Sequence, residues 1–124
     1  MSSRSALVVE DSPIMRQIIV SSLASLTNIT SFEAANGFEA LKMLPQKSFV
    51  IILTDINMPD INGLELLSFI KNHPLYRSIP VVIITTEKTE KDRQRGLALG
   101  ADDYLTKPFR AQELQEIIRR ILKF

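Results

Sequence analysis

Three carboxylates in this sequence occupy positions from which they could bind a metal ion together. Glu10 and Asp11 come directly after the apolar run Ala6–Val9, and Asp55 comes directly after Phe49–Thr54. Like charges that lie close together are unfavourable unless one is protonated or a cation lies among them. Since no cysteine or histidine accompanies these acids, the expected cation is a hard, oxygen-preferring divalent ion, and Mg²⁺ fits better than Ca²⁺.

Further polar groups stand at comparable positions. Asn57, two residues past Asp55, can add its backbone carbonyl to the metal site. Thr85 and Lys107 directly follow two further short runs, Pro80–Ile84 and Asp103–Thr106. A nucleophilic carboxylate, a metal ion and donors for phosphoryl oxygens are what phosphoryl transfer to a carboxylate requires. Taken singly, such residues are more often structural, because Asp is common at turns and caps. Only the complete set favours phosphoryl transfer.

The elements that must position these groups are predicted by β-branched runs that alternate with segments of helical period. The expected strands are Ala6–Val9, Thr30–Ala34, Phe49–Thr54, Pro80–Ile84 and Asp103–Thr106. The expected helices begin at Pro13, at Asn36-Gly37 and near Leu64, then cover Glu87–Leu99 and the amphipathic stretch Leu114–Leu122. The first helix is expected to bury one face that carries Met15, Ile18, Ile19, Leu23 and Leu26.

Five strand–helix pairs in one short chain predict an α/β fold, a doubly wound five-stranded parallel sheet with helices on both faces. Right-handed crossovers leave few strand orders for such a sheet, and the commoner one is 2-1-3-4-5, as in flavodoxin-like and CheY-like folds. In such sheets the functional site lies at the carboxyl ends of the strands, beside the switch point between the first and the third. Those are the strands that end at Glu10-Asp11 and at Asp55.

Composition excludes several other classes of protein. The chain has 124 residues, which predicts one domain over residues 1–124, and 45% hydrophobic with 23% charged residues is typical of a globular protein. A net charge of +1 gives no electrostatic reason to bind nucleic acid or a membrane surface. The absence of cysteine excludes disulfides, thiolate metal sites and thiol nucleophiles. No apolar run is long enough for a signal peptide or a membrane span, so we expect a soluble, cytoplasmic domain.

Over its whole length the chain resembles the receiver domains of two-component response regulators, and within that family the stand-alone CheY-like regulators of chemotaxis. Five motifs carry the resemblance, in order and at family spacing. They are Val8-Val-Glu-Asp-Ser12 followed by Met15-Arg16, Ala35-Asn-Gly37, Asp55-Ile-Asn-Met-Pro-Asp-Ile-Asn-Gly63, Pro80-Val-Val-Ile-Ile-Thr85 and Gly100-Ala-Asp-Asp-Tyr-Leu-Thr-Lys-Pro-Phe109.

The resemblance implies a role for each residue of the strand-end set. Asp55 would accept a phosphoryl group from a phosphohistidine on a sensor histidine kinase. Glu10, Asp11, Asp55 and the backbone carbonyl of Asn57 would hold Mg²⁺, for which Mn²⁺ can substitute. Lys107 would pair with the phosphoryl oxygens, across a cis bond to Pro108.

The resemblance also implies a covalent switch. Thr85 would move toward the phosphoryl group, and Tyr104 would turn inward with it. Asn57 and Glu87 match positions that tune the lifetime of the phosphoaspartate in this family, with rapid turnover in the chemotaxis branch. The protein would act as a monomer and pass the signal on by binding a downstream protein, such as a flagellar motor switch protein. A phosphatase would be a further partner. No turnover of an external substrate is expected.

Two residues depart from the commonest family pattern, and three alternatives stay open. Glu10 replaces a frequent Asp, and Thr86 replaces a small Ala beside the switch Thr. A phosphatase of the haloacid dehalogenase type would need a second Asp where Asn57 stands. An FMN-binding flavodoxin would need a phosphate-binding loop where Glu10 and Asp11 would repel a phosphate. The third alternative is a receiver fragment of a larger regulator, or a phosphorelay protein.

Overall fold

The five strands form one parallel sheet in the predicted order, which is β2-β1-β3-β4-β5. The computed structural model describes every residue except 1–3, 27, 88 and 124. The strands are β1 (Arg4–Val9), β2 (Ile29–Ala34), β3 (Phe49–Thr54), β4 (Val81–Thr85) and β5 (Asp103–Thr106). Because β1 pairs with both β2 and β3, the direction of strand addition reverses at β1. This topology confirms the predicted doubly wound fold.

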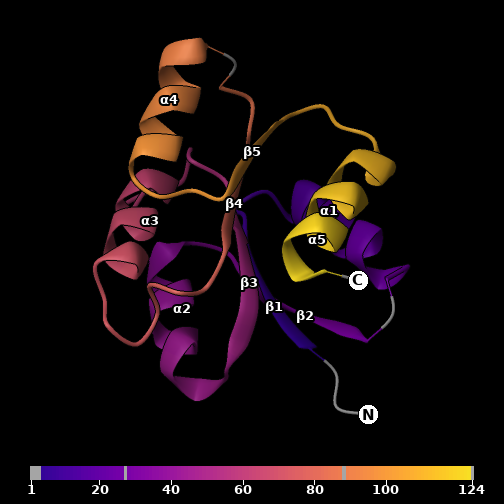
Figure 1. Cartoon of the computed structure of the whole chain (residues 1–124), viewed down its shortest axis with the longest axis horizontal. Coiled ribbons are helices and arrows are strands. Elements are labelled where there is room, and N and C mark those ends of the chain that lie inside the picture. The colour runs from indigo at the N-terminus through magenta and orange to yellow at the C-terminus, as the bar shows by residue number, and fades with distance from the viewer. Residues whose placement is uncertain (1–3, 27, 88, 124) are drawn as a thin grey trace.

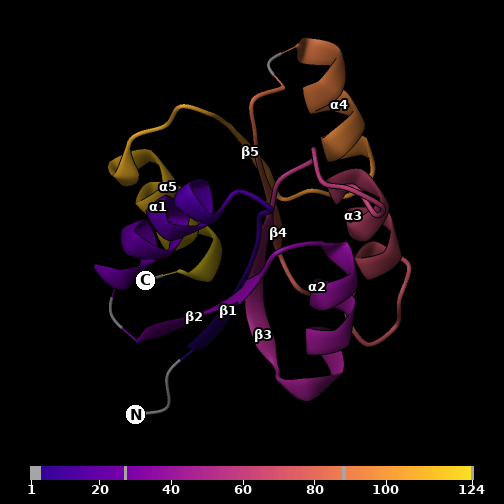
Figure 2. The ribbon, with the colours of Figure 1, turned by 180° about the vertical axis from the view of Figure 1, so that it is seen from behind.

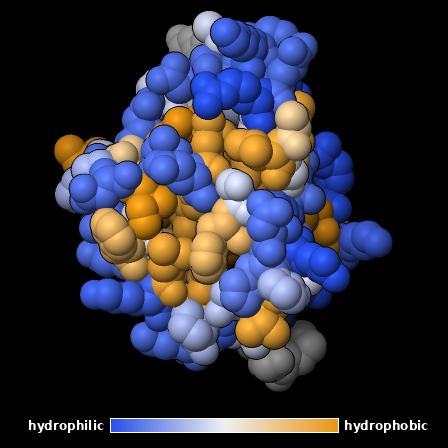
Figure 3. Space-filling view, turned by 90° about the vertical axis from the view of Figure 1, so that its left-hand side faces the viewer, coloured by the Kyte–Doolittle hydropathy of each residue, from blue (hydrophilic) through white to orange (hydrophobic). Residues whose placement is uncertain are grey.

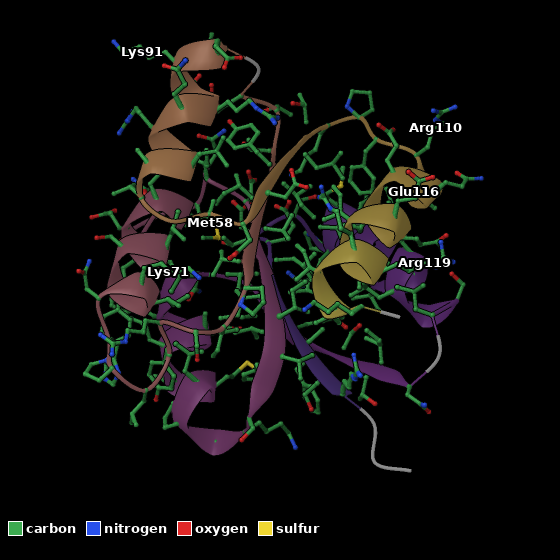
Figure 4. The ribbon with its side chains drawn as sticks, in the orientation of Figure 1. Met58, Lys71, Lys91, Arg110, Glu116 and Arg119 are labelled. Atoms are coloured by element: carbon green, nitrogen blue, oxygen red, sulfur yellow. The ribbon has the colours of Figure 1, made fainter. Side chains whose placement is uncertain are left out.

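Helices cover both faces of the sheet, α1 and α5 on one side and α2, α3 and α4 on the other (Figures 1 and 2). They are α1 (Pro13–Ala24), α2 (Gly37–Met43), α3 (Gly63–Lys71), α4 (Glu90–Ala98) and α5 (Ala111–Leu122), with the short 3₁₀ helix η1 (Leu44–Gln46) after α2. Lys71 on α3 and Arg119 on α5 therefore lie on opposite sides of the sheet (Figure 4). No helix within the described part of the chain is long and apolar enough to cross a membrane.

The core lies in two layers because successive side chains of a strand point to opposite faces. In β3, Ile52 packs with the core under α2 and α3, whereas Ile51 and Leu53 pack with the core under α1 and α5. In β4, Val81 and Ile83 face the first layer and Val82 and Ile84 face the second. Covering both faces of the sheet explains why the central strands are almost wholly apolar.

Some sequence-based expectations about the elements were wrong. Ile18 was expected on the buried face of the first helix, but it is 44% exposed. The buried stripe of α1 runs through Ile19 and Leu23, and Ile18 lies about 100° around the helix from Ile19. The fourth helix begins at Glu90 rather than at Glu87, because the hydroxyl of Thr89 caps it by accepting from the backbone N–H of Asp92.

The fourth strand is also displaced from its expected range by one residue. It covers Val81–Thr85, and Pro80 precedes it. Proline has no N–H to donate to a sheet, but its carbonyl still accepts from the backbone N–H of Ile52 at 2.9 Å. Thr85 therefore belongs to the strand itself, and its side chain is wholly buried.

Candidate functional site

The three candidate metal-binding carboxylates lie together at the carboxyl ends of β1 and β3. The two strands are paired, and the backbone N–H of Asp55 donates to the carbonyl of Val9 at 3.1 Å. One carboxylate oxygen from each of Glu10, Asp11 and Asp55 lies within 4.8 Å of the others. Glu10 and Asp55 are buried, whereas Asp11 is exposed at the mouth of the site. The sheet topology thus assembles the predicted acidic cluster.

A buried ammonium group lies between two of these acids. The Nζ of Lys107 is 2.5 Å from Oε1 of Glu10 and 3.3 Å from Oδ2 of Asp55. Lys107 follows β5 and donates its backbone N–H to the carbonyl of Thr85 at 2.8 Å. The bond between Lys107 and Pro108 is cis, as the family resemblance implied. Lys107 therefore reaches the acids from β5, past the carboxyl end of β4, which lies between β3 and β5.

The charges at this site do not balance in the absence of a metal ion. Burial raises the pKa of the Glu10 carboxyl above its usual value, although hydrogen bonds from Lys107 and from the backbone N–H of Ser12 oppose this, and the charge of Asp55 adds to it. Three carboxylates face one described ammonium group. Carboxylate oxygens that outnumber the neighbouring positive charge fit a hard divalent cation.

The backbone around Asp55 holds its carboxylate in one orientation. Oδ1 accepts from the backbone N–H of Ile56 at 2.7 Å, so Oδ2 is the oxygen nearest to Lys107. Gly63 packs directly against this turn, and its N–H donates to the carbonyl of Ile56 at 2.9 Å. A Cβ atom at Gly63 would lie only 1.9 Å from the carbonyl oxygen of Asp55. The glycine that ends the third motif is thus required by this close approach.

A second chain of hydrogen bonds joins the remaining predicted residues beside the acidic cluster. The Nδ2 of Asn57 donates to Oε1 of Glu87 at 3.1 Å, which links the loops after β3 and β4. The backbone N–H of Glu87 lies 3.4 Å from the hydroxyl oxygen of Thr85. The hydroxyl of Tyr104 donates to the carbonyl of Glu87 at 2.9 Å. Glu87 therefore contacts all three of the other residues to which the resemblance gave switching or lifetime roles.

Tyr104 lies in the interior of the protein. Its side chain is 5% exposed, and burial raises the pKa of its hydroxyl above 10.0, with the charges of Asp92 and Glu87 adding to the effect. Gly96 of α4 leaves room for the ring, since a Cβ there would lie 3.3 Å from Cδ2 of Tyr104. The ring thus joins β5 to α4 and to the loop that holds Glu87.

Sequence reasoning missed Arg16, which supports the acidic cluster from outside. Its Nη1 donates to the backbone carbonyl of Glu10 at 2.7 Å, and its Nε pairs with Glu33 at 3.0 Å. The only sequence signal was its place in the first motif, where no role was assigned to it. The contact joins α1 to β1 and β2, so it could be found only from the packing of these elements.

Comparison with known proteins places this arrangement in a family. Residues 6–119 match the family model described as response regulator receiver domain. The chain belongs to the response regulator receiver domains. It is 37% identical over 117 residues to a chemotaxis protein CheY homolog of Campylobacter jejuni, and the alignment covers 94% of this chain and 90% of that protein. Receiver domains are signalling proteins of two-component systems and do not turn over an external substrate.

Solved structures agree with this assignment. The chemotaxis protein CheY4 of Vibrio cholerae has a TM-score of 0.88 and 31% identity, with 97% of this chain and 99% of that chain covered. The receiver domain of a sensor histidine kinase from Pseudomonas aeruginosa also has a TM-score of 0.88, with 29% identity and coverage of 99% and 100%. That second structure holds a magnesium ion in its active-site cleft. The chain is thus a CheY-like receiver whose acidic cluster is compatible with a magnesium ion.

Proposed function

We propose that Asp55 accepts a phosphoryl group from the phosphohistidine of a sensor histidine kinase, and that this chain thereby relays a chemotaxis signal in the cytoplasm. The observation that carries the proposal is the position of the Asp55 carboxylate, which directly follows β3, contacts the ammonium group of Lys107 and lies beside the acids that follow β1. The alternatives of a phosphatase and of a flavin carrier receive no support from these contacts.

The reaction is a displacement at phosphorus. A carboxylate oxygen of Asp55 forms the new P–O bond while the P–N bond to the donor imidazole breaks, and the imidazole leaves with the electron pair of that bond. Mg²⁺, held by Glu10, Asp11, Asp55 and the backbone carbonyl of Asn57, would neutralise charge on the phosphoryl oxygens. Lys107 is already within 3.3 Å of Asp55 and would pair with one of those oxygens.

The signal would leave through the face formed by α4, β5 and α5. On phosphorylation, Lys107 exchanges its contact with Glu10 for the phosphoryl group, and the hydroxyl of Thr85 turns toward the same group. Because Glu87 contacts both Thr85 and Tyr104, a displacement at the site would reach β5 within two hydrogen bonds. The proposed receiver of the signal is a downstream protein such as a flagellar motor switch protein.

Asn57 and Glu87 would set the lifetime of the phosphorylated state. Their side chains meet at 3.1 Å and bridge the loops that follow β3 and β4, next to the acceptor. A bridge in this place restricts how water, or a phosphatase partner, approaches the phosphoaspartate.

The acceptor assignment is tested with acetyl phosphate and Mg²⁺. Asp55→Asn should abolish covalent labelling, because an amide oxygen is not a comparable nucleophile. Asp60→Asn, at an exposed Asp in the same loop, is the matched control and should be labelled like the wild-type protein. Labelling that persists in Asp55→Asn, or that disappears in both variants, would contradict the assignment.

The chemotaxis role needs a separate measurement. Phosphotransfer from each histidine kinase of the host to this chain should be fastest for a kinase of the chemotaxis system, and Asp55→Asn should accept from none. A faster transfer from a kinase outside that system would keep the acceptor role and reject the chemotaxis role.

A further inference from the structure

Arg16 reaches the acidic cluster from α1, and the proposed phosphoryl transfer gives it no role. Its side chain is only 19% exposed, so most of a charged group is withdrawn from water. Burial of a charge is unfavourable unless the group finds charged or polar partners. The two partners of Arg16 are the carbonyl oxygen of Glu10 at 2.7 Å and Oε1 of Glu33 at 3.0 Å. The first of them belongs to the backbone of a candidate metal ligand.

The Glu10 carbonyl is part of the peptide unit that joins the two acids after β1. A peptide unit is planar, so a contact that fixes its carbonyl oxygen also fixes the direction of the N–H and the Cα atom of Asp11. Asp11 is exposed, and one of its carboxylate oxygens lies within 4.8 Å of one from each of Glu10 and Asp55. The contact with Arg16 therefore sets the direction in which the chain presents Asp11 to a metal ion.

The other polar groups of Glu10 are held by different partners. Its N–H donates to the carbonyl of Ala34 at 3.0 Å. Its carboxylate oxygens accept from the backbone N–H of Ser12 at 3.1 Å and from Nζ of Lys107 at 2.5 Å. These contacts orient the side chain and the N–H of Glu10, but they leave the following peptide unit free to rotate. Arg16 adds the contact that fixes this peptide unit.

The start of α1 and the end of β2 hold the guanidinium group in place. The backbone N–H of Arg16 donates to the carbonyl of Ser12, the N-cap of α1, at 2.9 Å. Glu33, on β2, accepts from Nε while Nη1 donates to Glu10. Because the guanidinium group is planar and rigid, the ion pair with Glu33 also fixes the direction of Nη1. The same ion pair offsets the positive charge that Arg16 brings toward the site.

We infer that Arg16 is a positioning residue of the proposed Mg²⁺ site, which holds the peptide unit between Glu10 and Asp11 so that both carboxylates reach one ion. The inference rests on the Mg²⁺ site of the proposed function. A cation beside the site repels Mg²⁺ through its charge alone, so removal of that charge would by itself tighten Mg²⁺ binding. Removal of a group that orients metal ligands instead weakens binding, by about 10- to 100-fold. The two roles thus predict opposite effects.

The test is a titration of isotopically labelled protein with Mg²⁺ at constant ionic strength, followed by the backbone amide signals in NMR spectra. Arg16→Met removes the donor to the Glu10 carbonyl and should raise the dissociation constant of Mg²⁺ about tenfold. The spectra also verify folding, and the dissociation constant refers to the folded protein, so a loss of stability alone would not change it. Unchanged or tighter binding in Arg16→Met would overturn the inference.

A double variant separates geometry from charge. Arg16→Met/Glu33→Gln removes one charge of each sign, so the net charge near the site stays the same, but the Glu10 carbonyl still lacks its donor. This variant should bind Mg²⁺ at least about tenfold more weakly than the wild-type protein. Wild-type affinity in the double variant would overturn the inference, because charge would then account for any effect of the single one.

Arg77→Met is the matched control, because it removes the same charge from a different place. Arg77 is exposed between α3 and β4, at the amino end of β4, whereas the acidic cluster lies at the carboxyl ends of β1 and β3. Helix α3 lies on the side of the sheet that Figure 3 shows, where hydrophilic side chains surround a hydrophobic region, and α1 lies on the other side (Figures 1 and 2). Arg77→Met should leave the dissociation constant unchanged, and a loss equal to that of Arg16→Met would overturn the inference.

A measurement on the wild-type protein needs no variant to fold. The Nε–H signal of Arg16 should shift with added Mg²⁺ at the same dissociation constant as the amide signal of Asp11, whereas the Nε–H signal of Arg77 should not shift. An Arg16 signal that stays in place while that of Asp11 moves would overturn the inference and leave the Mg²⁺ site intact. A wild-type protein that binds no Mg²⁺ would overturn the proposed site together with the inference.

Discussion

Lys107→Met should destabilise the metal-free protein by about 3 kcal/mol. The substitution keeps a long flexible side chain in place but removes the charge that lies 2.5 Å from Glu10 and 3.3 Å from Asp55. At an effective dielectric constant of about 20 these contacts are worth about 7 and about 5 kcal/mol before desolvation, which costs several kcal/mol for each buried ion. Losing one partner of a buried pair costs about 3–5 kcal/mol, because the remaining charges stay buried.

We take the lower end of that range because Glu10 can take up a proton and so remove one of the unpaired buried charges. Burial already raises the pKa of its carboxyl, and loss of Lys107 favours uptake of a proton still further. The double variant Glu10→Gln/Lys107→Met should therefore recover most of the stability lost in the single variant.

The assay is urea unfolding followed by far-ultraviolet circular dichroism, because the chain contains no tryptophan. Measured with EDTA, the midpoint should fall in Lys107→Met with an unchanged slope. Mg²⁺ at about 100 times its dissociation constant should stabilise the wild-type protein by about 2.7 kcal/mol. The same Mg²⁺ concentration should stabilise the variant by more, since its carboxylates lack any other described cation.

Lys91→Met is the control, because Lys91 is exposed on α4 (Figure 4). It should change stability by no more than about 0.5 kcal/mol. A loss below about 1 kcal/mol in Lys107→Met, or equal stabilisation of both proteins by Mg²⁺, would show that the buried charges are not coupled as the structure indicates.

Three further predictions concern the neighbourhood of Asp55. Gly63→Ala should cost about 3 kcal/mol or more in urea unfolding, because its Cβ would lie 1.9 Å from the Asp55 carbonyl oxygen. Gly96→Ala, whose nearest contact is 3.3 Å, should cost less than about 1 kcal/mol, and equal losses would refute the steric argument. The pKa of Tyr104 is raised above 10.0, so its contribution to stability is complete below that pH and is lost as the pH rises through the folded-state pKa. In a pH titration followed by the absorbance of phenolate, the wild-type protein should show an ionisation step above pH 10.0 that Tyr104→Phe lacks. A Tyr104 step at or below pH 10.0 would contradict this prediction. Glu87→Ala should shorten the lifetime of the phosphorylated state about fivefold, the equivalent of one lost hydrogen bond of about 1 kcal/mol. Glu87→Gln keeps an oxygen that can accept from Asn57 and should not shorten it. Equal lifetimes in the two variants would reject a role for the hydrogen bond between Asn57 and Glu87.

The sequence by itself determined the fold and the identity of the candidate site residues. Strand β3 was predicted with the bounds that the structure shows, because a strand of a parallel sheet covered on both faces is apolar at nearly every position. Right-handed crossovers left few possible strand orders, and the commoner of them, 2-1-3-4-5, implied that Glu10 and Asp55 meet at the carboxyl ends of neighbouring strands. The resemblance to receiver domains then implied roles for Thr85 and Lys107, and these roles remain proposals.

Only the tertiary structure decided which partner each of these side chains contacts. Lys107 and Glu10 are 97 positions apart in the chain, and their 2.5 Å contact depends on the packing of β1 against β3, of β3 against β4 and of β4 against β5. The support of Glu10 by Arg16 and the exposure of Ile18 depend in the same way on how α1 lies on the sheet. Helical period predicts which residues share a face, but burial depends on what covers that face.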